Sequence, residues 1–153
     1  MSLYRNKENY YDPTAGSAIA NMLREERRQR KIGYRPLTYI VSRYSGDISK
    51  NTEDARRYCR FAVDQGRIPI CSHLLFPQFL HDNDPKEREL GCFFGMVLMN
   101  RCKEIWIFSD GEFSSGMQEE YDHARRHGSR IRYFTTECCE IESPGKRGGD
   151  GPL

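Results

Sequence analysis

Short apolar runs that alternate with longer helical segments most constrain how this chain can fold. Strands connected by helices form parallel sheets with right-handed crossovers, and the helices cover both faces of the sheet. The sequence therefore predicts an α/β domain that is Rossmann-like (flavodoxin-like), with three layers and a mostly parallel sheet of four to five strands. The predicted strands are residues 37–41, 68–71, 104–108 and 129–134. The predicted helices are residues 14–31, 51–65, 85–100 and 116–127, and residues 73–84 are predicted to form a long aromatic loop.

Three parts of the chain differ in composition. Residues 1–36 are predicted to be an N-terminal arm and helix, and residues 37–142 form the α/β domain. Residues 143–153 are rich in Gly and Pro, and a segment with so little apolar surface is expected to be a disordered tail.

Charge and cysteine content exclude several classes of protein. The net charge is +2, and residues 24–31 carry the densest basic run. Glutamates within that run favour a helix face exposed to solvent. The alternative interpretation is an adaptor that binds nucleic acid through residues 14–31. The six cysteines form no CxxC pair and no zinc spacing, so neither a metal site nor a disulfide framework is expected. The vicinal pair Cys138-Cys139 suggests no mechanism.

No apolar run approaches the length that spans a bilayer, and the first residues lack the apolar block of a secretory signal. We therefore expect a cytoplasmic protein.

The segment 108–124 indicates a strand end, a Gly/Ser loop and the start of a helix. Ser115 and Gln118 fit a capping box, and Gly128 fits the helix stop. Glu120 lies about 60° around the helix from Met117, at the rim of the stripe expected to face the sheet. Acids near a helix start also complement the helix dipole, so the adjacent Glu119 and Glu120 need no catalytic purpose by themselves.

The loops that follow three of the predicted strands should converge at one edge of the sheet, where α/β domains bind ligands. These loops are residues 42–47, 71–76 and 109–115. None carries a glycine-rich phosphate-binding sequence, so neither a dinucleotide nor an NTP site is expected, and no cofactor is predicted.

The order and spacing of these motifs resemble the nucleoside 2-deoxyribosyltransferase and nucleotide N-glycosidase superfamily, especially its small bacterial and phage branches. The resemblance covers about residues 37–134 and includes an opening strand motif, a G-x-x-P strand, a histidine and a Gly-Glu-Ala spacing. The matching residues are Tyr39-Ile40-Val41-Ser42-Arg43-Tyr44, Asn51, Gly66-Arg67-Ile68-Pro69, His73, Gly116, Glu120 and Ala124.

The resemblance implies that Glu120 attacks the anomeric carbon of a nucleotide or nucleoside, displaces the base and forms a glycosyl ester. We expect the start of its helix to keep this carboxylate ionised. Ser114 stands where the nucleotide hydrolases carry a serine for the 5′-phosphate, and Arg43 could supply the opposing charge. The predicted substrate-binding residues are Ser42, Arg43, Tyr44, His73, Arg88, Ser114, Ser115 and Gly116, with Glu120 as the catalytic residue.

One departure from the family pattern weakens the case for catalysis. The family's second acid would fall at about Met96, where no acid stands; Glu87, Arg88, Glu89 or His73 could substitute for it. Without a substitute, the protein would be a non-catalytic nucleotide- or signal-binding module. His73 could also be a capped loop residue, Tyr44 a packing aromatic and Arg88 an exposed helix charge. The resemblance also implies a homo-oligomer, with the N-terminal helix and arm suited to that contact.

Overall fold

The structure is a computed structural model that describes residues 13–143. The predicted arm before residue 13 and the tail from residue 144 lie outside the described residues. The chain divides into two compact units, residues 1–35 and 36–153. Helix α1 (Pro13–Ile32) belongs to the first unit. All the elements described below belong to the second.

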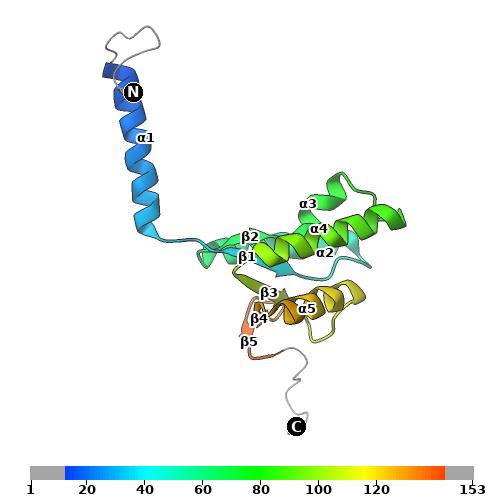
Figure 1. Cartoon of the computed structure of the whole chain (residues 1–153). Coiled ribbons are helices and arrows are strands. Elements are labelled where there is room, and N and C mark those ends of the chain that lie inside the picture. The colour runs from blue at the N-terminus through cyan, green and yellow to red at the C-terminus, as the bar shows by residue number, and fades with distance from the viewer. Residues whose placement is uncertain (1–12, 144–153) are drawn as a thin grey trace. The chain divides into compact units, whose positions relative to one another are not determined.

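The second unit contains one five-stranded sheet with the strand order β2-β1-β3-β4-β5 (Figure 1). Strands β1 to β4 are parallel, and β5 pairs antiparallel with β4. This arrangement confirms the predicted flavodoxin-like, mostly parallel α/β sheet. The strands are β1 (Leu37–Val41), β2 (Ile68–Ile70), β3 (Glu104–Phe108), β4 (Arg130–Phe134) and β5 (Glu140–Ile141).

Helices cover both faces of the sheet and complete three layers. Side chains that alternate along β1 and β3 enter two separate cores, as the two-residue period of a strand requires. Helix α2 (Ile48–Asp64) closes the first core, in which Ile40, Trp106 and Phe108 are buried. Helices α4 (Pro85–Arg101) and α5 (Ser115–His127) close the second core over Tyr39 and Ile105.

The start of α5 differs from its prediction by one residue. Ser114, in extended backbone, is the N-cap, and its Oγ accepts a hydrogen bond from the Met117 N–H at 3.2 Å. The capping box that was predicted on Ser115 is therefore wrong. The predicted stop is confirmed, because Gly128 takes the left-handed conformation with φ 75° that glycine tolerates.

The segment predicted as a long aromatic loop is partly helical. It contains the short helix α3 (Ser72–Leu75) and the 3-10 turn η1 (Phe76–Gln78), and only the residues after η1 form a loop before α4. Within residues 13–143, no helix combines the length and the apolar character needed to cross a membrane.

Candidate active site

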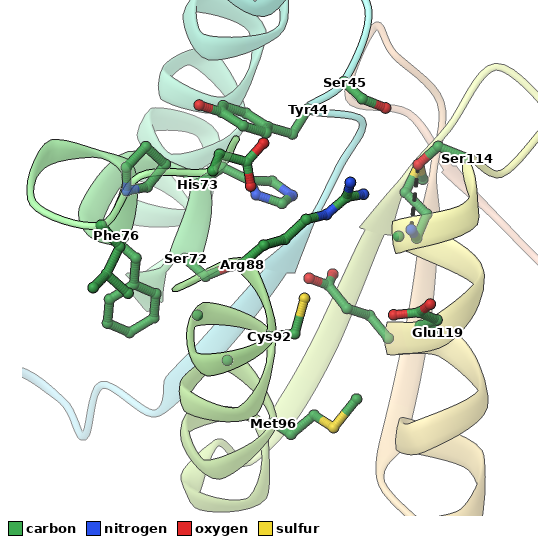
Figure 2. Close-up of a pocket in the computed structure, with 18 of the residues that line it drawn as sticks. Tyr44, Ser45, Ser72, His73, Phe76, Arg88, Cys92, Met96, Ser114 and Glu119 are labelled. Carbon is green, nitrogen blue, oxygen red and sulfur yellow. Dashed lines mark hydrogen bonds between the residues drawn. The ribbon is translucent and has the colours of Figure 1, made fainter. Parts of the chain in front are cut away.

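A cleft opens where the parallel strands end, as expected for a sheet of this topology. Its walls are the loop after β1, the segment from α3 to the loop before α4, one face of α4 and the first turns of α5 (Figure 2). The structure brings Tyr44, His73, Arg88, Ser114, Gly116 and Glu120 together as lining residues of this cleft. Three predicted binding residues do not line it: Ser42 is buried behind it, and Arg43 and Ser115 are exposed outside it.

Glu120 projects from the second turn of α5 into the buried end of the cleft. Its Oε1 lies 3.5 Å from the Tyr39 hydroxyl, and its Oε2 is buried with no hydrogen-bond partner among the described residues. Burial raises the pKa of the Glu120 carboxyl well above its usual range; the neighbouring Cys71 and Glu119 add to the rise, and the Tyr39 hydrogen bond opposes it. The structure therefore favours the protonated carboxyl.

This upward shift of the pKa is opposite to the expectation that the helix start would favour the ionised form of Glu120. The helix dipole acts on groups within about the first turn. Because α5 begins at Ser115, Glu120 lies past that turn. Removal of the carboxyl from water has the larger effect on its pKa.

Tyr39 is a site residue that the sequence analysis missed. It lies in β1, is fully buried, and its hydroxyl is 2.9 Å from Ser72 Oγ as well as 3.5 Å from Glu120. Burial raises the pKa of Tyr39 well above 10, so the phenol stays protonated and can donate. A usable signal exists in the sequence, because a tyrosine hydroxyl inside a buried strand must find a polar partner.

Helix α4 approaches this hydroxyl closely at a glycine. A Cβ built on the buried Gly95 would lie 3.0 Å from the Tyr39 hydroxyl oxygen, which is tighter than ordinary contact. The neighbouring Met96 occupies the position at which the resembling family has an acid, and it lines the cleft. This position is therefore part of the site, but a methionine has no proton to give. Glycine here leaves the space that the hydroxyl occupies.

A stacked pair of rings forms the wall opposite α5. The Tyr44 and His73 rings are 4.9 Å apart and nearly parallel. His73 Nε2 lies 3.1 Å from the Ser42 carbonyl, and because a carbonyl only accepts, this nitrogen carries the proton. Burial lowers the pKa of His73, so the ring is neutral at neutral pH and its Nδ1 is an acceptor. Ser42 thus orients His73 instead of contacting the cleft.

Arg88 brings a positive charge into a cleft that is otherwise acidic. Its side chain reaches from α4 into the space between His73 and Ser114 (Figure 2). It forms no ion pair with any residue in the described part of the chain. The residue that could oppose an anion at Ser114 is therefore Arg88, whereas the prediction gave this role to Arg43.

The possible substitutes for the missing acid are placed differently. Glu87 lines the cleft, but its Oε2 accepts the His81 backbone N–H at 2.8 Å and is tied to the loop. Asp82, which the sequence analysis did not consider, also lines the cleft and lies near enough to His73 to oppose the fall in its pKa. Glu89 is exposed and does not line the cleft. Within residues 13–143, no cluster of three His, Cys, Asp or Glu side chains could hold a metal ion.

Comparisons with known proteins give one family and similar solved structures. The family described as "Domain of unknown function (DUF7768)" matches residues 36–134. No curated protein matches the sequence. The structure is similar to a 2-deoxyribosyltransferase from Bacillus psychrosaccharolyticus, with a TM-score of 0.52 and 14% identity over 70% of this chain and 77% of that one. A 2-desoxiribosyltransferase from Leishmania mexicana gives a TM-score of 0.46 and 12% identity over 75% of this chain and 88% of that one. The first similarity shows a nucleoside 2-deoxyribosyltransferase-like fold, which confirms the resemblance seen in the sequence.

Proposed function

We propose that this chain, which belongs to the family described as "Domain of unknown function (DUF7768)", cleaves the N-glycosidic bond of a nucleotide or nucleoside. The observation that carries the proposal is the Glu120 carboxyl at the buried end of the cleft, held 3.5 Å from the Tyr39 hydroxyl. The similar fold of a 2-deoxyribosyltransferase supports the same chemistry.

The reaction needs Glu120 as a carboxylate. One carboxylate oxygen attacks the anomeric carbon, the bond between that carbon and the base nitrogen breaks, and the base leaves with the electron pair and takes up one proton. Water then hydrolyses the glycosyl ester, or a second base accepts the sugar. Because the Met96 position lacks an acid, the proton for the base has to come from another group on the cleft wall, for which Asp82 is the candidate. The neutral His73 ring has its proton on Nε2, against the Ser42 carbonyl, and cannot supply it.

The substrate class follows from the charges at the other end of the cleft. The first N–H groups of a helix bind anions, and Ser114 and Gly116 line the cleft at the start of α5. The Arg88 guanidinium lies across from them, and its planar fork suits a phosphate. Among the candidate substrates, these groups favour nucleoside 5′-monophosphates.

A second candidate is a nucleotide- or signal-binding module without turnover. Two observations favour it: no acid stands at Met96, and burial raises the pKa of the Glu120 carboxyl, which opposes the ionised form that the attack needs. Such a module would be stabilised by a nucleotide but would release no base. The proposal further includes a cytoplasmic location and a homo-oligomer, both from the sequence and the resemblance.

The test is base release from a panel of nucleoside monophosphates and their nucleosides, followed by chromatography. We expect release from a monophosphate, loss of release in Glu120→Gln, and retention in Asp122→Asn, which alters a carboxyl of the same helix outside the cleft. Arg88→Gln should reduce release from the monophosphate more than from the nucleoside. Thermal stabilisation without product would favour the binding module, and release that persists in Glu120→Gln would exclude the proposed nucleophile.

A further inference from the structure

One hydrogen-bond network joins side chains from three elements at the buried end of the cleft. This Tyr39 network consists of Ser72, Tyr39 and Glu120: the Tyr39 hydroxyl of β1 lies 2.9 Å from Ser72 Oγ of α3 and 3.5 Å from Glu120 Oε1 of α5. Tyr39 is fully buried, whereas Ser72 is buried but still lines the cleft (Figure 2). Helix α4 closes over both hydroxyls at Gly95, where a Cβ would lie 3.0 Å from the Tyr39 oxygen and 3.8 Å from Ser72 Oγ.

The Tyr39 hydroxyl has one proton but two acceptors within reach. If Tyr39 donates to Ser72, Glu120 receives no hydrogen bond from it. If Tyr39 donates to Glu120, the Ser72 hydroxyl can rotate and donate its own proton to the Tyr39 oxygen, so all three groups stay paired. Hydrogen bonds that end on a carboxylate are stronger than those between neutral groups, and each bond polarises the next. The second arrangement therefore belongs to the ionised form of Glu120, and Ser72 stabilises that form more than the neutral one.

We propose that Ser72 is a positioning residue for Glu120: its hydroxyl donates to Tyr39 and thereby directs the single Tyr39 proton onto the Glu120 carboxylate. Ser72 acts through Tyr39 and does not have to touch the reacting atoms. The inference rests on the proposed function for its catalytic meaning, but it concerns the ionisation of Glu120 and is measured without a substrate. The Ser72 hydrogen bond also lowers the pKa of Tyr39, and a more acidic phenol is a better donor to the carboxylate.

Other titratable groups face Glu120 from the elements packed around it, and they keep their charges in the variants proposed below. Cys71, directly before α3, and Glu119 of α5 raise the pKa of Glu120, and Cys92 of α4 is close enough for Glu120 to raise its pKa. The remaining titratable or charged residues on the cleft walls are Tyr44, His73, Asp82, Glu87 and Arg88. A change in the titration of Glu120 therefore reports the Tyr39 network.

Carbon-13 NMR of the Glu120 side-chain carboxyl, assigned by its loss in Glu120→Gln, follows its titration from about pH 4 to 10. In Ser72→Ala, the midpoint should move up by about half a pH unit or more, because a bond that stabilises the carboxylate is lost. Ser45→Ala is the matched control: Ser45 lines the same cleft outside the network, so the midpoint should stay. Ser72→Thr keeps the hydroxyl and should titrate like the wild type. An unmoved midpoint in Ser72→Ala, or an equal rise in Ser45→Ala or Ser72→Thr, would overturn the proposal.

A double variant separates an effect through Tyr39 from a direct one. Tyr39→Phe alone should also raise the midpoint, and Ser72→Ala should add nothing to it, because the hydroxyl that transmits the effect is gone. Circular-dichroism melts check that each variant is folded. A further rise in the double variant would show that Ser72 acts on Glu120 by another route and would refute the inference. Failure of the wild type to release any base would contradict the proposed function, whereas the titration would still decide the role of Ser72.

Discussion

Glu120→Gln should make the protein more stable at neutral and alkaline pH. In the folded state, burial raises the pKa of this carboxyl, so the native protein holds a proton that the unfolded chain has already released. A raised pKa contributes stability that is complete below the unfolded pKa and is lost as the pH rises to the folded pKa. Glutamine has a similar shape and nothing to ionise, so it avoids that loss.

The size of the effect follows from linkage. The unfolded pKa of Glu is about 4.3, and below it the two proteins should differ little. Between that pH and the folded pKa of Glu120, the free energy of unfolding of the wild type should fall relative to the variant by about 1.4 kcal/mol per pH unit. Above the folded pKa, the difference in the free energy of unfolding between the two proteins becomes constant. Dividing it by about 1.4 kcal/mol gives the number of pH units by which folding raises the pKa of Glu120.

Urea unfolding at closely spaced pH values from about 4 to 9, followed by circular dichroism, measures this difference. Asp122→Asn is the control, since it also converts a carboxyl of α5 to an amide but lies outside the cleft. Its difference from the wild type should show no comparable slope. The reasoning is refuted if the gap between the wild type and Glu120→Gln is independent of pH, or if the wild type is the more stable protein at alkaline pH.

Two further variants test how the carboxyl is held. Tyr39→Phe removes the hydrogen bond that lowers the pKa of Glu120. In a plot of the rate of base release against pH, the rise on the acid side should therefore move to higher pH. A rise that stays at the same pH would contradict this contact. Gly95→Ala puts a Cβ 3.0 Å from the Tyr39 hydroxyl and should slow base release. Gly91→Ala, also on the cleft wall, makes an ordinary 3.6 Å contact with Leu80; it should leave Tyr39 in place and stabilise α4 by about 0.5–1 kcal/mol. Thermal melts and rates compare the two, and equal rates would show that Gly95 does not position Tyr39.

Strands β1, β3 and β4 were predictable because most of their residues are apolar. The edge strand β5 was not, because its two residues are exposed and carry no apolar pattern. Part of what holds it is a contact between neighbouring strands: Arg132 Nε and Nη2 of β4 donate to the Glu140 carboxylate of β5, both at 2.8 Å. Turns as short as α3 likewise lack the length over which a helical period becomes visible.

The candidate site was predictable only where the chain itself fixes the spacing. Glu120 follows from its position in α5, but the choice of Ser114 over Ser115 as N-cap depends on the backbone angles of a single residue. Arg88 lines the cleft, and the buried Tyr39 hydroxyl meets Glu120, because α4 packs beside α5 and over β1. No local pattern encodes this tertiary arrangement.

On the proposed function, the substrate itself would have to ionise the nucleophile. The protonated carboxyl that burial favours cannot attack an anomeric carbon, and a negatively charged phosphate nearby would raise the pKa of Glu120 further unless Arg88 opposed that charge. Glu120 Oε2 is buried and has no partner among the described residues, so a sugar hydroxyl that donates to it would stabilise the carboxylate. Arg88 and the unpartnered Oε2 would then act together: the guanidinium neutralises the phosphate while the sugar hydroxyl lowers the pKa. A ligand that lacks this hydroxyl would bind without activating Glu120, which links the choice of substrate to the protonation state of one side chain.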